Sequence, residues 1–123
     1  MKFTKSMSET EKEIMDYIWY INQPISSNQL LTHFNNKDKH WKIQTLSTFL
    51  KRLVEKGILQ SEQKGRTHYY TPKITSNQYE NLKAKSFLNT MYNGSIKNFL
   101  SALYNEKIDK DDIDELKNWL DKM

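Results

Sequence analysis

The first third of the chain alternates short polar stretches with apolar residues at helical spacing. Ser8 and Glu11 form a capping-box pair, and the apolar positions that follow them predict a helix over about residues 9–21. Ser26 and Gln29 repeat the capping pattern after a break and predict a second, short helix. The apolar positions of these two helices are Ile14, Met15, Ile18, Trp19 and Ile21, then Leu30, Leu31 and Phe34.

A third amphipathic stripe predicts a helix over about residues 42–56, with Gly57 where a left-handed helix terminator is expected. Its apolar positions are Ile43, Leu46, Phe49, Leu50, Leu53 and Val54. Two β-prone runs follow on either side of Lys64 and Gly65, and Pro72 ends the second run. This part of the chain is therefore expected to form a small β-hairpin.

Helical spacing returns between residues 75 and 123. Three helices fit the apolar pattern, with breaks near Asn93/Gly94 and Lys107–Asp109. The chain as a whole is therefore expected to be mainly α with a small β-hairpin.

Three helices followed by a β-hairpin is the element order of a winged helix-turn-helix domain, in which the third helix enters the major groove of DNA. Residues 1–73 are expected to form this winged-helix DNA-binding domain. Residues 74–123 are expected to form a separate C-terminal helical dimerisation domain.

Positive charge is concentrated in the middle of the chain, whose net charge is +4. Residues 37–73 hold nine Lys or Arg against three acids. Residues 1–36 hold three Lys against four acids, and residues 74–123 hold seven Lys against eight acids. A basic segment of this kind favours a phosphate-bearing partner, although a solvated basic face without a partner has the same composition.

The polar face of the third predicted helix carries side chains that suit DNA. Gln and Thr recognise base edges and thymine methyl groups, whereas Lys and Arg reach phosphate oxygens or guanine. No acid lies between residues 42 and 54, which argues against an ordinary solvated face of mixed sign. The candidates are Gln44, Thr45, Ser47, Thr48, Lys51 and Arg52. Arg66 at the hairpin tip is either a contact to a flanking phosphate or the minor groove, or a plain exposed turn residue.

The predicted C-terminal helices carry more apolar surface than three short helices bury alone. One recognition helix covers only a few base pairs, so specific binding needs a second half-site and a symmetric dimer. We therefore expect a homodimer interface in this part of the chain. Its expected residues are Phe87, Leu88, Met91, Ile96, Phe99, Leu100, Leu103, Tyr104, Leu116, Trp119 and Leu120.

Other classes of function find little support in the composition. The chain has no cysteine, and its three histidines lack a metal-ligand spacing, so no metal or other cofactor is expected. The sequence has no Ser/His/Asp arrangement and no glycine-rich phosphate loop, so we do not expect an enzyme. It has neither a run of ~20 apolar residues nor a signal-peptide core, so we expect a cytoplasmic protein without membrane insertion.

Four stretches combine these features in a specific way, namely SETEKEIMDYIW, ISSNQLL, QTLSTFLKRLVEKGIL and THYYTP. Together they resemble the penicillinase-repressor family, the BlaI/MecI/CopY-type transcriptional repressors. The resemblance runs nearly end to end and is most specific at Met15–Trp19, at Thr45–Gly57 and in the tail phrase DIDELKNWL. It implies a dimer of winged-helix domains, held together by the C-terminal helices, that represses its operon by binding an inverted-repeat operator in double-stranded DNA.

The resemblance also implies residue roles. The recognition-helix roles fall on Lys42, Gln44, Thr45, Thr48, Lys51 and Arg52, and the wing role falls on Arg66. Family members open the recognition helix with Ser-Pro where this chain has Lys42 and Ile43, which weakens the cap and alters one phosphate contact. Relatives also carry a basic residue in the middle of the reading face, where this chain has Ser47. Both departures affect which operator sequence is expected, and they leave the expected docking of the third helix in the major groove unchanged.

In the β-lactam branch, the resemblance implies induction by cleavage in the dimerisation domain, prompted by a membrane sensor-protease. Relatives are cut at an Asn-Phe bond, which matches Asn98/Phe99 as a dipeptide and Ala102/Leu103 when the chains are aligned on Gly94. Phe99 is alternatively a buried residue of the dimer core. The copper branch senses metal through a cysteine-rich C-terminus, and this chain has no cysteine.

Two other functions stay open at this point. A winged-helix repressor released by a small-molecule inducer would have a ligand-shaped cavity near the dimer helices. A winged-helix protein-interaction module would carry an acidic or mixed face on its third helix, and the basic face argues against this function.

Overall fold

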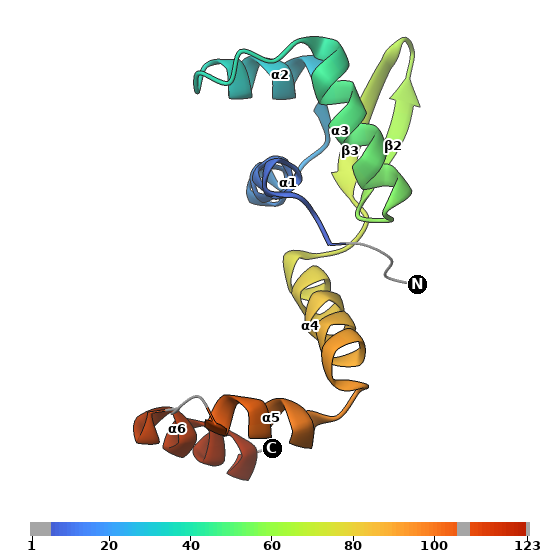
Figure 1. The fold of residues 1–123 in the computed structure, drawn as a ribbon. Coiled ribbons are helices and arrows are strands. Elements are labelled where there is room, and N and C mark those ends of the chain that lie inside the picture. Colours follow the sequence, from blue (N-terminus) through green and yellow to red (C-terminus); the bar gives the residue numbers. More distant parts are fainter. Residues whose placement is uncertain (1–5, 106–108, 123) are drawn as a thin grey trace. The chain divides into compact units, whose positions relative to one another are not determined.

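The computed structural model describes residues 6–105 and 109–122, which form six helices and three strands (Figure 1). The mainly α fold with a small antiparallel sheet that the sequence predicts is confirmed. The chain divides into two compact units, Met1–Lys83 and Ala84–Met123. This division falls inside helix α4 (Ser76–Tyr92), whereas the expected domain boundary lies between residues 73 and 74.

Helix α1 (Glu9–Ile21) begins at the capping box that the sequence predicts. The Ser8 hydroxyl oxygen accepts a hydrogen bond from the Glu11 N–H at 3.2 Å, and Glu11 Oε1 accepts one from the Ser8 N–H at 2.8 Å. Both bonds satisfy N–H groups that would otherwise lack a partner at the start of the helix. Asn22 ends α1 in the left-handed conformation, with a φ of 51°.

Helix α2 (Ser27–Asn35) also begins at its predicted capping box. The Gln29 N–H donates to Ser26 Oγ at 3.2 Å, and the Ser26 N–H donates to Gln29 Oε1 at 3.0 Å. Directly before α2 lies strand β1 (Ile25–Ser26), which the sequence did not indicate. Two residues are too few to show an alternating pattern.

Helix α3 (Ile43–Glu55) has Lys56 as its C-cap and is terminated by Gly57, as the sequence predicts. Gly57 has a φ of 78°, its N–H donates to the Val54 carbonyl at 3.0 Å, and the Ile58 N–H donates to the Leu53 carbonyl at 3.1 Å. These two bonds form a Schellman motif, which needs a left-handed residue at the glycine position. At the other end of α3, the N-cap Lys42 makes no side-chain cap bond, so the predicted weak cap is confirmed.

The predicted hairpin consists of β2 (Leu59–Lys64) and β3 (Thr67–Pro72), joined by a turn at Gly65 and Arg66. Gly65 has a φ of 65°, which glycine adopts without a steric cost. Strand β1 pairs with the other side of β3, so the sheet order is β1-β3-β2 and all pairs are antiparallel. The wing is therefore anchored to the start of α2 through β3.

The hydrophobic core of the first unit is formed by one face each of α1, α2 and α3 together with the start of the hairpin. Tyr79 of α4 belongs to it, since its hydroxyl accepts a hydrogen bond from the Met7 N–H at 2.7 Å. Trp19 Nε1 donates to the Ile74 carbonyl at 3.0 Å and ties α1 to the segment before α4. Burial of each large apolar side chain contributes about 1.5–3 kcal/mol. The buried apolar residues are Ile14, Met15, Ile18, Ile25, Leu30, Phe34, Leu46, Leu50, Leu53, Ile58, Leu59, Ile74 and Tyr79.

The second unit contains the end of α4, helix α5 (Ile96–Asn105) and helix α6 (Lys110–Asp121). The predicted break after α4 is confirmed at Asn93/Gly94, where both residues have positive φ. The second predicted break, at Lys107–Asp109, lies mostly outside the described residues. Asp109 caps α6 by accepting a hydrogen bond from the Asp111 N–H at 3.2 Å.

Candidate nucleic-acid interface

The exposed side of α3 presents the polar residues that the sequence singles out. The apolar stripe of α3 packs into the core through Leu46, Leu50 and Leu53, which are fully buried. Residues on the other side of a helix with this stripe must face solvent. All seven predicted contact residues are exposed, namely Lys42, Gln44, Thr45, Thr48, Lys51, Arg52 and Arg66.

Two of these side chains are held by neighbours on α3. Thr48 Oγ1 donates to the Gln44 carbonyl at 3.0 Å, which restrains the rotamer of this exposed side chain. The Arg52 guanidinium lies 6.0 Å from the centre of the Phe49 ring, and that ring lies 5.8 Å from the ring of Trp41. Arg52 therefore occupies the flank of α3 that faces Trp41, since a cation–π contact restrains its long side chain.

The charge around these residues is positive. Among the residues that the structure describes, no ion-pair partner is found for four of the predicted contact residues, namely Lys42, Lys51, Arg52 and Arg66. Unpaired cations on one surface attract phosphate and raise the rate of encounter with DNA. The structure thus brings five predicted residues together on α3 beside the N-cap Lys42, whereas Arg66 lies apart, at the turn of the hairpin.

An open groove between α3 and the hairpin was missed by the reasoning from sequence. Its volume is about 230 Å³. It is lined by Ser47, Lys51, Val54, Ser61, His68 and Tyr70. Ser47, which the sequence placed on the reading face, lies on the flank toward the hairpin. Burial raises the pKa of the Tyr70 hydroxyl, so this group stays protonated and able to donate.

Strand alternation is the sequence signal that could have grouped part of this lining. Residues two apart on a strand share a face, so His68 and Tyr70 could be grouped from the sequence. Which face looks toward α3 depends on the register of β2 against β3, and the sequence does not give that register.

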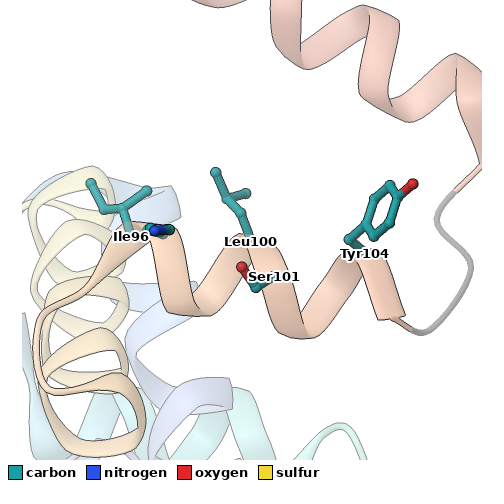
Figure 2. A pocket seen from close by; sticks show the side chains of 5 residues that line it. Ile96, Leu100, Ser101 and Tyr104 are labelled. Carbon is teal, nitrogen blue, oxygen red and sulfur yellow. The ribbon is translucent and has the colours of Figure 1, made fainter.

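The second unit exposes most of the residues predicted for a dimer interface. No described residue of α5 or α6 is buried. Ile96, Leu100 and Tyr104 point to the same side of α5 (Figure 2), and Ile96 is 64% and Tyr104 70% exposed. Among the described residues of this unit, the other exposed large apolar side chains are Phe87, Met91, Leu103, Leu116, Trp119 and Leu120. Leu88, Phe99 and Leu100 are half-buried.

Both candidate cleavage bonds lie inside α5. Phe99 of the Asn98/Phe99 pair is half-buried, with its ring centre 5.4 Å from that of Tyr92. In the alternative register, Ala102 is half-buried and Leu103 is exposed. A protease binds the segment around the bond that it cuts in an extended conformation. Cleavage at either bond therefore requires local unwinding of α5.

Within residues 6–105 and 109–122, no group of three or more His, Cys, Asp or Glu side chains is placed to hold a metal ion. No helix in the described part of the chain is long and apolar enough to cross a membrane.

The comparison with known proteins gives a consistent result. Residues 7–122 match the family model described as penicillinase repressor. A penicillinase repressor of Bacillus licheniformis is 36% identical over 96 residues, which are 78% of this chain and 73% of that protein. The methicillin resistance regulatory protein MecI of Staphylococcus aureus (strain N315) is 27% identical over 120 residues, which are 97% of this chain and 96% of that protein.

Solved structures resemble the first unit. The solution structure of the DNA binding domain of the repressor BlaI has a TM-score of 0.55 at 34% identity and covers 64% of this chain and 94% of that chain. The Bacillus licheniformis BlaI monomeric form, solved in complex with the blaP half-operator, has a TM-score of 0.51 at 33% identity and covers 63% of this chain and 92% of that chain. The expected winged-helix fold is therefore confirmed.

Proposed function

Because the chain belongs to the penicillinase-repressor family, whose members are transcriptional repressors and not enzymes, we propose that it is a homodimeric repressor of an inverted-repeat DNA operator. The observation that carries the proposal is the exposed face of α3, where polar and unpaired basic side chains meet and no acid occurs between residues 42 and 54. This face lies in a unit that is similar to a repressor solved in complex with a half-operator.

In the proposed complex, α3 lies in the major groove. Gln44, Thr45 and Thr48 contact base edges, because amide groups suit adenine and threonine methyls suit thymine. The cations Lys42, Lys51, Arg52 and Arg66 contact phosphates or guanine and fix the register of α3 on the duplex. This arrangement accounts for the absence of acids between residues 42 and 54.

A second copy of the chain binds the second half-site of the operator. The exposed apolar residues of α5 and α6 support this part of the proposal, because an isolated chain leaves aromatic and leucine side chains in water. A two-fold interface of this kind buries the same patch on both protomers. The operator then needs two half-sites related by the same symmetry.

We propose that a membrane sensor-protease ends repression by cutting α5, either at Asn98/Phe99 or at Ala102/Leu103. Either cut separates α6 from the rest of the chain and so removes part of the interface.

A small-molecule inducer is the alternative to proteolysis. The hollow along Ile96 and Tyr104, of about 620 Å³, is wide open, whereas small ligands bind in pockets that cover most of their surface.

The first experiment is a gel-shift titration with the protein's own upstream intergenic DNA and a scrambled duplex of the same length, at two salt concentrations. The proposal expects tight, selective binding of two protomers per site. Equal, weak and salt-sensitive binding to both duplexes would contradict sequence-specific repression and favour a protein-interaction module. Release of DNA without chain cleavage would contradict the proteolytic mechanism and favour the inducer.

Replacing Thr45 or Gln44 with alanine is expected to change which operator is preferred. A lost base contact costs about 1–3 kcal/mol against the original site, which is about 5- to 150-fold in affinity. Competition gel shifts with single-base variants of the site measure the change. Thr90→Ala, at an exposed position of α4 in the second unit, is the matched control. If both α3 variants kept the original operator preference, residues other than Thr45 and Gln44 would make the specific base contacts.

Replacing Arg66 with alanine is expected to weaken binding to all duplexes alike, since a phosphate contact carries no sequence information. The slope of log affinity against log salt should become shallower by about 0.9, the value for one released counterion. Lys85→Ala, an exposed cation in the second unit, should leave the slope unchanged. Loss of affinity for only one sequence would show that Arg66 reads bases.

A further inference from the structure

The groove between α3 and the hairpin has the composition of an anion site. Of its six lining residues, Ser47, Lys51, Ser61, His68 and Tyr70 carry an N–H or O–H donor. None of the six is an acid. A phosphate oxygen only accepts hydrogen bonds, and its charge strengthens each of them.

Three elements bring these donors together. Ser47, Lys51 and Val54 follow each other at helical spacing and therefore share one flank of α3. Ser61 pairs with Tyr70 across β2 and β3, and His68 lies two residues from Tyr70, so all three share one face of the hairpin. Helix α3 lies beside β2 (Figure 1). This face of the hairpin and this flank of α3 therefore supply the residues that line the groove.

The charged and titratable groups around His68 are few. Lys51 faces it from α3, and Tyr70 shares its strand and face. Strand β2 contributes the uncharged Ser61 and Gln63, and Gln63 is the cross-strand partner of His68. Glu62 pairs with Tyr69 and so lies on the opposite face of the hairpin. The groove therefore holds one positive charge when His68 is neutral and two when it is protonated.

From this geometry we infer that the groove binds one backbone phosphate of the duplex that α3 reads, and that His68 makes the affinity for DNA rise as the pH falls. The inference rests on the proposed function and adds to it a specific site and a pH response. Lys51 and protonated His68 supply charge from the two walls, while the hydroxyls of Ser47, Ser61 and Tyr70 supply neutral donors.

The test compares the full-length protein with His68→Gln, which keeps a polar side chain but cannot be protonated. Affinity for the upstream duplex and for the scrambled duplex is measured at pH 6 and pH 8. The unaltered protein should bind both duplexes about 3- to 10-fold more tightly at pH 6, with a salt slope steeper by about 0.9. His68→Gln should remove most of the pH effect and the change of slope.

His40→Asn is the matched control, because His40 is an exposed histidine of the same basic segment that does not line the groove. Asparagine also tolerates the positive φ of 57° at this position. This control should keep the full pH response. Lys51→Gln should lower the salt slope by about 0.9 at both pH values.

Equal pH responses in the unaltered protein and His68→Gln would overturn the inference while leaving the proposed function intact. A pH response on only one duplex would also overturn it, because phosphate contacts do not depend on sequence. If the unaltered protein bound neither duplex, the proposed function itself would fail. Circular dichroism of each variant verifies that the fold is retained.

Discussion

Replacing Glu11 with glutamine is expected to lower the free energy of unfolding of the first unit by about 2–3 kcal/mol. Glu11 is only 2% exposed, and its Oε1 accepts a hydrogen bond from Lys56 Nζ at 2.6 Å. Lys56 Nζ also donates to the Ser6 carbonyl at 3.2 Å. Glutamine keeps the shape of the side chain but removes the charge, so the ammonium of Lys56 loses its counter-ion in a mostly buried place.

The position of this pair explains the size of the effect. Glu11 belongs to the capping box of α1, and Lys56 is the C-cap of α3. The pair therefore joins the start of the first helix to the end of the helix that carries the candidate DNA-binding face. Lys56→Gln should cost a similar amount, and the double variant should cost less than the sum, because each single change already breaks the pair.

The effect should also depend on pH. Burial alone would raise the pKa of Glu11, but the hydrogen bonds from Lys56 and Ser8 outweigh it and hold the pKa below the ordinary value of 4.5. A lowered folded-state pKa means that this stabilisation is fully present above about pH 4.5 and is lost as the pH falls through the folded value. The difference between the unaltered protein and Glu11→Gln should therefore shrink below that pH.

Urea unfolding followed by circular dichroism, at fixed protein concentration, measures these differences. The matched control is Asp16→Asn on the same helix, which breaks the exposed Lys12–Asp16 pair at 2.7 Å. An exposed i,i+4 pair contributes about 0.5 kcal/mol or less. Equal effects of Glu11→Gln and Asp16→Asn would mean that the buried pair is no more important than a surface pair.

The helices of the first unit were predictable because their signals are local. Two capping boxes and a glycine terminator mark the ends of α1, α2 and α3, and each is satisfied by residues no more than five positions apart. The winged-helix fold followed from the order of these elements. The resemblance to the repressor family pointed to the same fold through other residues.

Features that depend on distant contacts were not predictable. Strand β1 exists because Ile25 and Ser26 pair with Tyr70 and Tyr69, more than forty positions away along the chain. The helical pattern of α4 gives no sign that Tyr79 packs into the first unit, because that contact reaches back to Met7. The phosphate groove was missed for the same reason, since its walls come from α3 and from the register of the hairpin.

Replacing Trp119 with aspartate is expected to convert a dimer into a monomer at tens of micromolar and to weaken operator binding about 100-fold. Trp119 is 58% exposed and shares the apolar stripe of α6 with Ile113, Leu116 and Leu120. A tryptophan buried at the centre of an interface contributes about 2–4 kcal/mol, and a charge in its place adds a desolvation cost. The loss on DNA follows because two half-sites are then bound by two independent monomers.

Sedimentation equilibrium measures the assembly, and gel shifts with one and with two half-sites measure the binding. Affinity for one half-site should stay within about twofold, since α3 and the hairpin belong to the other unit. Tyr20→Asp is the matched control, because Tyr20 is an 84% exposed aromatic residue of α1 outside the proposed interface. A Trp119→Asp protein that stayed dimeric would contradict an interface through α6. If the unaltered protein were monomeric and still bound both half-sites with full affinity, binding would not need a protein dimer.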